Sequence, residues 1–290
     1  MKLDGRREST HVEDRRRMGG GSAAGLGIGG AAIIAVITLL MGGNLGDVVR
    51  NIAGAGGIST GAAYETNYEP TAENEALAKF SRQILASTED VWTAYFSASG
   101  IGDYEPPTLV LYTGSTSTSC GQGQAAMGPF YCSADRKLYI DLSFFSTMRR
   151  QLGADGDFAY AYVIAHEVGH HVQNLLGTLG KAHQQMARMS KTDANHMSVR
   201  IELQADFYAG VWAHYENSMF TSIEEGDLEE AVRCASVIGD DYLQKKAKGY
   251  AVEDSFTHGT AAQRVKWLKK GMRTGDIRQG DTFSLPASRL

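Results

Sequence analysis

The chain has 290 residues, of which 43% are hydrophobic and 21% are charged. This length and composition accommodate one sizeable globular domain with an extension. The formal net charge is −5 and the sequence shows no basic patch, which argues against nucleic acid as a partner because phosphate binding requires clustered Lys and Arg.

The amino end is organised differently from the rest of the chain. Residues 1–17 are polar and carry six Lys or Arg against four acidic residues, whereas residues 18–46 carry no charge. A bilayer span needs about 20 mostly apolar residues, and 21–41 supplies them. Because basic flanks stay in the cytoplasm, we predict a cytoplasmic basic tail at 1–17, a single-pass transmembrane signal-anchor at 18–46, and a periplasmic or extracellular remainder.

Two other interpretations compete with an anchor. The most hydrophobic part, 31–41, suits a signal peptide, and Ala53-Gly-Ala55 resembles a cleavage site, but it lies beyond two charged residues. A buried soluble helix is the second alternative, although dense glycines weaken a water-exposed helix. We expect an uncleaved anchor, followed at 47–70 by a flexible linker containing a stretch rich in Gly, Ala and Ser.

The folded domain is expected at 71–290. Helical periodicity at 73–97 predicts a long opening helix. β-Rich segments follow at Thr108–Tyr112, 129–132 and 137–142, and the last two are predicted to form a hairpin. The strand at 137–142 is either a sheet edge to which a peptide substrate adds itself as a strand, or an ordinary half-buried strand.

Cysteine usage is consistent with export. Cys120 and Cys132 are separated by twelve positions across a Gly-rich loop, an interval that a disulfide can close in an oxidising compartment. The alternative is two reduced thiols. Cys234 is left single, and its apolar surroundings predict a buried helical thiol.

The pentapeptide 166–170 reads His-Glu-Val-Gly-His, within a helix predicted from a cap at Asp157 to about Gly177. On a helix, His166 and His170 lie one turn apart on the same face, so their rings converge on one metal ion. Glu167 points to the neighbouring face, where it reaches a metal-bound water as a general base. The alternative is a helix whose two His residues are ordinary surface or core groups.

Two His residues do not complete a catalytic zinc site, which usually has three protein ligands. A metzincin continuation is excluded because Gln173 and Leu176 occupy its Gly and His positions. The best candidate for the third ligand is Glu202, in a second predicted helix. Asp206 lies one turn further on, where it can accept a hydrogen bond from a zinc-bound His and orient it. The alternative is an acidic pair on a solvated helix face.

These residues are similar to a known family. The two motifs His166-Glu-Val-Gly-His170 and Glu202-Leu-Gln-Ala-Asp206 resemble those of the gluzincin peptidases. The match is narrowed by Gly5-Arg-Arg-Glu-Ser9, by the stretch from Gly128 to Phe144, and by the Thr-His-Gly-Thr motif at 257–260, which together resemble the bacterial putative neutral zinc metallopeptidase family. The resemblance spans nearly the whole chain, and it implies zinc binding and membrane attachment.

A hydrolytic site also needs a donor for the developing oxyanion. His258 is the first candidate, because it precedes a predicted helix and related gluzincins carry a His in a comparable motif. The alternatives for His258 are a role as a helix cap or loop residue, or binding of zinc in a latent state of the protein. Tyr208, Tyr139 and His171 are rival donors, although His171 is turned about 100° away from the ligand face.

The sequence therefore predicts an α+β fold, with a small sheet and a mainly helical C-terminal part after the anchor. The predicted function is that of a membrane-anchored zinc metalloendopeptidase: one zinc ion held by His166, His170 and Glu202, with Glu167 as general base and a peptide or protein as substrate. The alternative is a noncatalytic, membrane-tethered binding or assembly factor with a structural zinc. Glu167 discriminates between them, since a structural site needs no base beside its ligands.

Overall fold

The computed structural model describes residues 1–17 and 71–290, so the predicted anchor (18–46) and linker (47–70) lie outside the described residues. Among the residues that are described, no helix is long and apolar enough to cross a membrane. The helices and strands are, in chain order, β1 (Val12–Asp14), α3 (Ala72–Ser99), β2 (Thr108–Tyr112), β3 (Ser115–Thr118), β4 (Gly121–Gln124), β5 (Phe130–Cys132), β6 (Lys137–Asp141), α4 (Ser143–Thr147), α5 (Asp157–Leu175), α6 (Thr178–Met186), α7 (Lys191–Phe220), α8 (Asp227–Val237), α9 (Asp240–Lys248) and α10 (Ala261–Thr274). Short 3-10 and π turns connect some of them.

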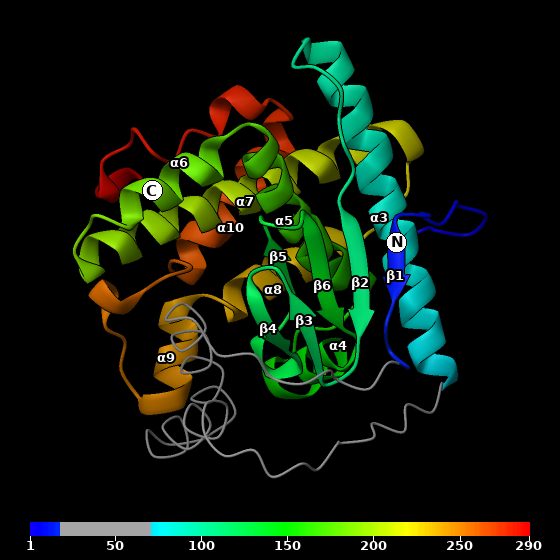
Figure 1. Ribbon diagram of the computed structural model, residues 1–290, viewed down its shortest axis with the longest axis horizontal. Coiled ribbons are helices and arrows are strands. Elements are labelled where there is room, and N and C mark those ends of the chain that lie inside the picture. The colour runs from blue at the N-terminus through cyan, green and yellow to red at the C-terminus, as the bar shows by residue number, and fades with distance from the viewer. Residues whose placement is uncertain (18–70) are drawn as a thin grey trace.

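A four-stranded sheet in the order β1-β2-β6-β5 forms the β part of the fold (Figure 1). The first three strands run parallel, and β5 pairs antiparallel with β6, which confirms the predicted hairpin. Strands β3 and β4 make a separate hairpin. The chain is helical from Asp157 almost to its end, so the fold class is α+β, as predicted.

The interior position of β6 corrects the proposed substrate edge. The segment 137–142 was one candidate for an edge strand that receives a peptide, but β6 has β2 on one side and β5 on the other. Both of its backbone edges are therefore already paired. Within the described residues, the outer strands of this sheet are β1 and β5.

Helix α5 lies at the centre of the fold. It packs against α7, α8 and α3, and its residues from Phe158 to Gly169 are buried without interruption. A helix that is apolar on nearly all sides is expected in such a position, surrounded by other elements. The large buried side chains around it include Trp92, Trp212 and Phe158, whose ring stacks on that of Trp212 at 5.8 Å.

Residues 1–17 belong to the folded domain, in contrast to the separate tail predicted from the sequence. Strand β1 pairs with β2 in parallel, with Val12 opposite Leu109. The side chain of Arg16 is 5% exposed and lies against the first turn of α3, where it pairs with Glu75. The polar composition of this segment predicted a separate tail. That prediction was wrong because several of its charged groups pair with residues far along the chain, and the local sequence does not reveal such partners.

The cysteines lie as expected. Cys120 and Cys132 form a disulfide that joins the β3–β4 hairpin to β5, with their Cα atoms 5.8 Å apart. Cys234 is a buried free thiol on α8. Burial raises the pKa of this thiol to about 12, so it is protonated and inert at neutral pH.

Candidate metal centre

The candidate centre forms where α5 passes close to α7. Gly169, within the His-Glu-Val-Gly-His motif, lies at the crossing: a Cβ atom there would be only 2.8 Å from the carbonyl oxygen of Ala205. The missing side chain lets the two backbones approach to a distance that larger residues prevent. The predicted ligands on the two helices consequently face each other across a short gap.

The three predicted metal ligands are brought together by this crossing. The Nε2 atom of His166 lies 3.2 Å from one carboxylate oxygen of Glu202, and the Nε2 atom of His170 lies 3.5 Å from the other. Ligand atoms of the three residues all lie within 4.8 Å of one another. Two imidazoles and one carboxylate are the donor set of a catalytic zinc site with an open position.

Both imidazoles are oriented through their other nitrogen. The Nδ1 atom of His166 donates to Asp206 at 2.7 Å, and the Nδ1 atom of His170 donates to the amide oxygen of Gln173 at 2.9 Å. With Nδ1 protonated, Nε2 keeps its lone pair for a metal ion. This arrangement is what zinc ligation by histidine requires, so the residues present fit a zinc ion.

Asp206 is the centre of a buried charge network. Its fully buried carboxylate accepts hydrogen bonds from the Tyr162 hydroxyl at 2.5 Å and from two guanidinium nitrogens of Arg264 at 2.8 and 2.9 Å, in addition to His166. Burial by itself raises the pKa of this carboxyl, but Arg264 and His166 more than offset that and hold it below its usual value. Asp206 is therefore an anion on α7, and its position is fixed by groups on α5 and α10.

Glu167 is placed beside the ligands with an altered acidity. Its side chain is buried, and burial raises its pKa to about 7, against an opposing effect from His166. A carboxyl group with a pKa near neutrality both accepts and releases a proton at physiological pH, which suits a general base.

His258 lies on a loop that is wrapped around one carboxylate. The backbone N–H groups of Thr257, His258 and Gly259 all donate to the same oxygen of Asp240, at 2.8, 2.6 and 3.0 Å. The Nδ1 atom of His258 is 3.3 Å from the other oxygen. Burial by itself raises the pKa of Glu202, but the charges of His170 and His258, with His166, more than offset that and lower it, so the His258 imidazole acts on the centre. Over a third of the His258 side chain is exposed.

The rival donors lie elsewhere. Tyr139 belongs to a separate cluster, where its hydroxyl donates to Asp135 at 2.8 Å. Both nitrogens of His171 are engaged, by the Tyr131 hydroxyl and by the carbonyl oxygen of Glu105. Tyr208 is buried, with its ring against that of Trp92. Among the predicted donors, His258 is the one whose charge acts on the predicted ligand Glu202.

Four residues of the network were not predicted from the sequence as functional: Tyr162, Gln173, Asp240 and Arg264. Two had a local signal, because Tyr162 is four residues before His166 and Gln173 three after His170, on the same side of one helix. The other two had none, because Arg264 is 58 positions away from Asp206 and Asp240 is 18 positions away from His258.

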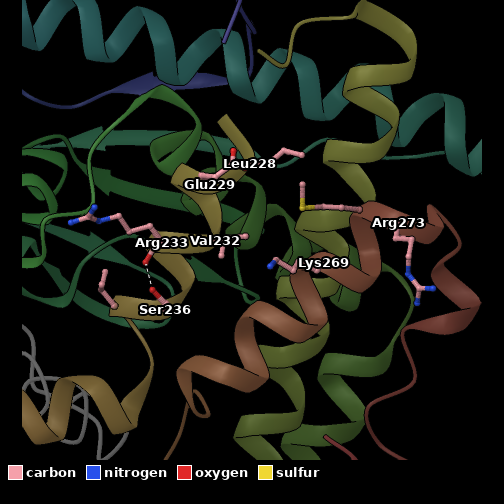
Figure 2. Close-up of a pocket in the computed structure, with 9 residues that line it drawn as sticks. Leu228, Glu229, Val232, Arg233, Ser236, Lys269 and Arg273 are labelled. Atoms are coloured by element: carbon pink, nitrogen blue, oxygen red, sulfur yellow. Dashed lines mark hydrogen bonds between the residues drawn. The ribbon is translucent and has the colours of Figure 1, made fainter. Parts of the chain in front are cut away.

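A cavity of about 870 Å³ lies between α8 and α10, apart from the candidate centre (Figure 2). Its walls carry aliphatic side chains such as Leu228 and Val232, and cationic groups including Lys269 and Arg273. Figure 2 shows no predicted ligand or base among the residues that line it. The size of this cavity therefore does not identify the reactive site.

Comparison with known proteins agrees with the geometry. The chain is 48% identical over 288 residues to a protein of Escherichia coli K12 named uncharacterized protein YpfJ, covering 98% of this chain and 99% of that one. It is 42% identical over 191 residues to uncharacterized protein Rv2575 of Mycobacterium tuberculosis H37Rv, covering 62% and 64% of the two chains. No solved structure matches. The model of a family described as putative neutral zinc metallopeptidase matches residues 1–283, and the chain belongs to that family.

Proposed function

We propose that the protein is a zinc-dependent peptidase in which His166, His170 and Glu202 hold one zinc ion. The observation that carries this proposal is the convergence of three ligand side chains beside the buried carboxyl group of Glu167. A purely structural site has no use for that base, and it closes its fourth position with a protein ligand. Within the described residues the ligand group consists of these three side chains.

The residues of the chain divide the work of hydrolysis among them. A bound zinc ion supplies Lewis-acid chemistry, lowering the pKa of a coordinated water to about 7 and polarising a carbonyl group. Glu167 accepts the proton of the attacking water and delivers it to the leaving amine. His258 donates a hydrogen bond to the developing oxyanion, and Asp240 holds its ring in place.

Membrane attachment and an extracytoplasmic site belong to the same proposal. The uncharged interval 18–46 supports attachment to a bilayer. The disulfide between Cys120 and Cys132 supports an oxidising compartment for the domain that carries the centre. A substrate of this enzyme is then a peptide or protein outside the cytoplasm.

Glu167→Gln tests the catalytic role. The amide keeps the shape of the side chain and cannot accept the proton, so we expect zinc content and thermal stability to persist while hydrolysis of a peptide library falls by roughly 10²- to 10⁴-fold. Glu73→Gln is the matched control, since that side chain is 62% exposed and is a member of neither motif.

The ligand set is tested separately by metal analysis of His166→Ala and Glu202→Ala. Each variant is expected to lose bound zinc. Unchanged stoichiometry in the Glu202 variant contradicts its role as third ligand. Full biological activity of Glu167→Gln contradicts the peptidase and favours the noncatalytic binding factor.

A further inference from the structure

Residues 12–14 form a strand, β1, in the sheet of the domain that carries the candidate centre. Leu109 on β2 donates its backbone N–H to the carbonyl oxygen of His11 at 2.9 Å, and Arg15 donates to the carbonyl oxygen of Leu111 at 2.7 Å. Two strands that pair in this way must lie on the same side of a membrane. An open sheet cannot lie within the bilayer, because its unpaired backbone groups would have no hydrogen-bond partners there.

A buried ion pair connects this segment to α7, the helix of Glu202. Arg6 pairs with Glu216 at 2.9 Å, and its guanidinium lies 3.7 Å from the centroid of the Phe220 ring. Glu216 is fully buried and also accepts hydrogen bonds from Ser87 and Ser222. A buried carboxylate of this kind needs its cationic partner, because an unpaired charge in the interior is strongly destabilising.

The two ends of the intervening segment meet at the same place on the domain. The Arg16 guanidinium pairs with Glu75 at 3.0 Å and lies 3.4 Å from the carbonyl oxygen of Asn74, both in the first turn of α3. Residue 17 is next to Arg16, and Thr71 is the N-cap of α3. In Figure 1 the end of β1 and the start of α3 accordingly lie at the same end of the molecule.

A single passage through a bilayer is incompatible with this geometry. One crossing separates the ends of a segment by the hydrocarbon core, which is about 30 Å thick. Two helical crossings return the chain to its starting side but need about 40 apolar residues, and the uncharged interval 18–46 has 29. We infer that residues 1–17 and the metal centre occupy the same compartment, on one side of any membrane to which the protein is attached.

The basic residues that predicted a cytoplasmic tail have another role in the fold. Five of them form ion pairs with carboxylates: Lys2 with Glu224, Arg6 with Glu216, Arg7 with Glu89 and Asp90, Arg15 with Glu13, and Arg16 with Asp14 and Glu75. Loop charges set membrane orientation when they are exposed beside a span. Here the charges are used to attach the segment to the domain.

The test is the accessibility of two introduced thiols in intact cells that express the full chain. Thr10→Cys places one on the exposed surface of the amino-terminal segment, and Asp254→Cys places the other on the domain, at a side chain that is 75% exposed. A membrane-impermeant maleimide is applied before and after permeabilisation of the membrane. Mass spectrometry of the labelled peptides separates these sites from the native cysteines.

We expect both positions to respond alike, either labelled in intact cells or labelled only after permeabilisation. Labelling of one position in intact cells and of the other only after permeabilisation overturns the inference and restores the single-pass anchor. The outcome does not depend on hydrolysis, so it is independent of whether the peptidase proposal holds. Labelling of both positions in lysate confirms that each variant exposes its thiol.

Discussion

At the scale of single residues, the two imidazole ligands are held by groups of different charge. His166 donates to the anionic Asp206, whereas His170 donates to the neutral amide of Gln173. That amide is itself anchored, because its nitrogen donates to the carbonyl oxygen of Ile201 at 2.8 Å and to Gln204 at 3.1 Å, both on α7. Gln173 therefore connects the orientation of one ligand on α5 to the helix that carries the third.

Replacing Gln173 with Met tests this connection, since Met has a similar volume and offers no acceptor of comparable strength. We expect zinc affinity to fall by roughly 10- to 100-fold, the usual effect of losing a group that orients a ligand. Competition with a chromophoric chelator measures it, and Gln185→Met on the exposed face of α6 is the control. Equal affinities in both variants argue that Gln173 only fills space.

Asp240 makes the stability of the His258 loop dependent on pH. Burial raises the pKa of this carboxyl, but its hydrogen bonds with His258 and Gly259 more than offset that, and the pKa in the folded state lies below the usual value. The stability that it contributes is therefore present above the unfolded pKa of about 3.9 and is lost as the pH falls through the lower folded value. Asp240→Asn should lack this contribution.

Urea unfolding of both proteins at pH 6 and at successively lower pH measures the effect. The stability difference between the parent chain and Asp240→Asn is expected to be largest at pH 6 and to shrink below about pH 4. The exposed Asp103 provides the control substitution Asp103→Asn. A difference that is the same at every pH assigns the role of Asp240 to packing alone.

At the scale of elements, the distance between α5 and α7 sets the geometry of the ligands. Gly169→Ala adds a methyl group 2.8 Å from the Ala205 carbonyl oxygen, so we expect the helices to separate, stability to fall by about 1–3 kcal/mol, and zinc affinity to fall with it. Gly180→Ala is the opposite case, because no atom lies within 4 Å of a Cβ on this exposed helical residue. It should raise stability by about 0.4–1 kcal/mol.

Thermal unfolding and chelator competition on the two glycine variants measure these effects. Unchanged zinc affinity in Gly169→Ala means that the helix crossing tolerates expansion.

The elements themselves were predictable: the long opening helix, the three strands, and the helices of Glu167 and Glu202 all lie close to the segments that periodicity indicates. Which strands are central was not predictable, because strand order depends on contacts between distant segments.

At the scale of the whole molecule, the amino-terminal segment completes the domain. A fragment of residues 71–290 loses β1 and leaves Glu216 buried without Arg6, so we expect it to be less stable by about 3–5 kcal/mol and to aggregate through the open edge of β2. Replacing 18–70 by a Gly/Ser linker should preserve the fold, since Arg16 already contacts the start of α3.

Comparing the thermal midpoints of the fragment and of the linker-joined chain tests this expectation. Equal midpoints, with both proteins monomeric, contradict a structural role for residues 1–17. The measurement also separates a structural role of residues 1–17 from the tail predicted from the sequence, because a free tail leaves the midpoint unchanged when it is removed.

The sequence by itself determined which side chains form the candidate metal centre of this protein. Side chains at positions i and i+4 share a helix face, so local spacing brought His166 together with His170, and Glu202 with Asp206. Only the tertiary structure decided that Arg264 from α10 holds Asp206 behind His166. It also decided that the basic amino end is a strand of the domain. The reason in both cases is that a charged or polar side chain carries no local sign of a partner that lies far away in the chain.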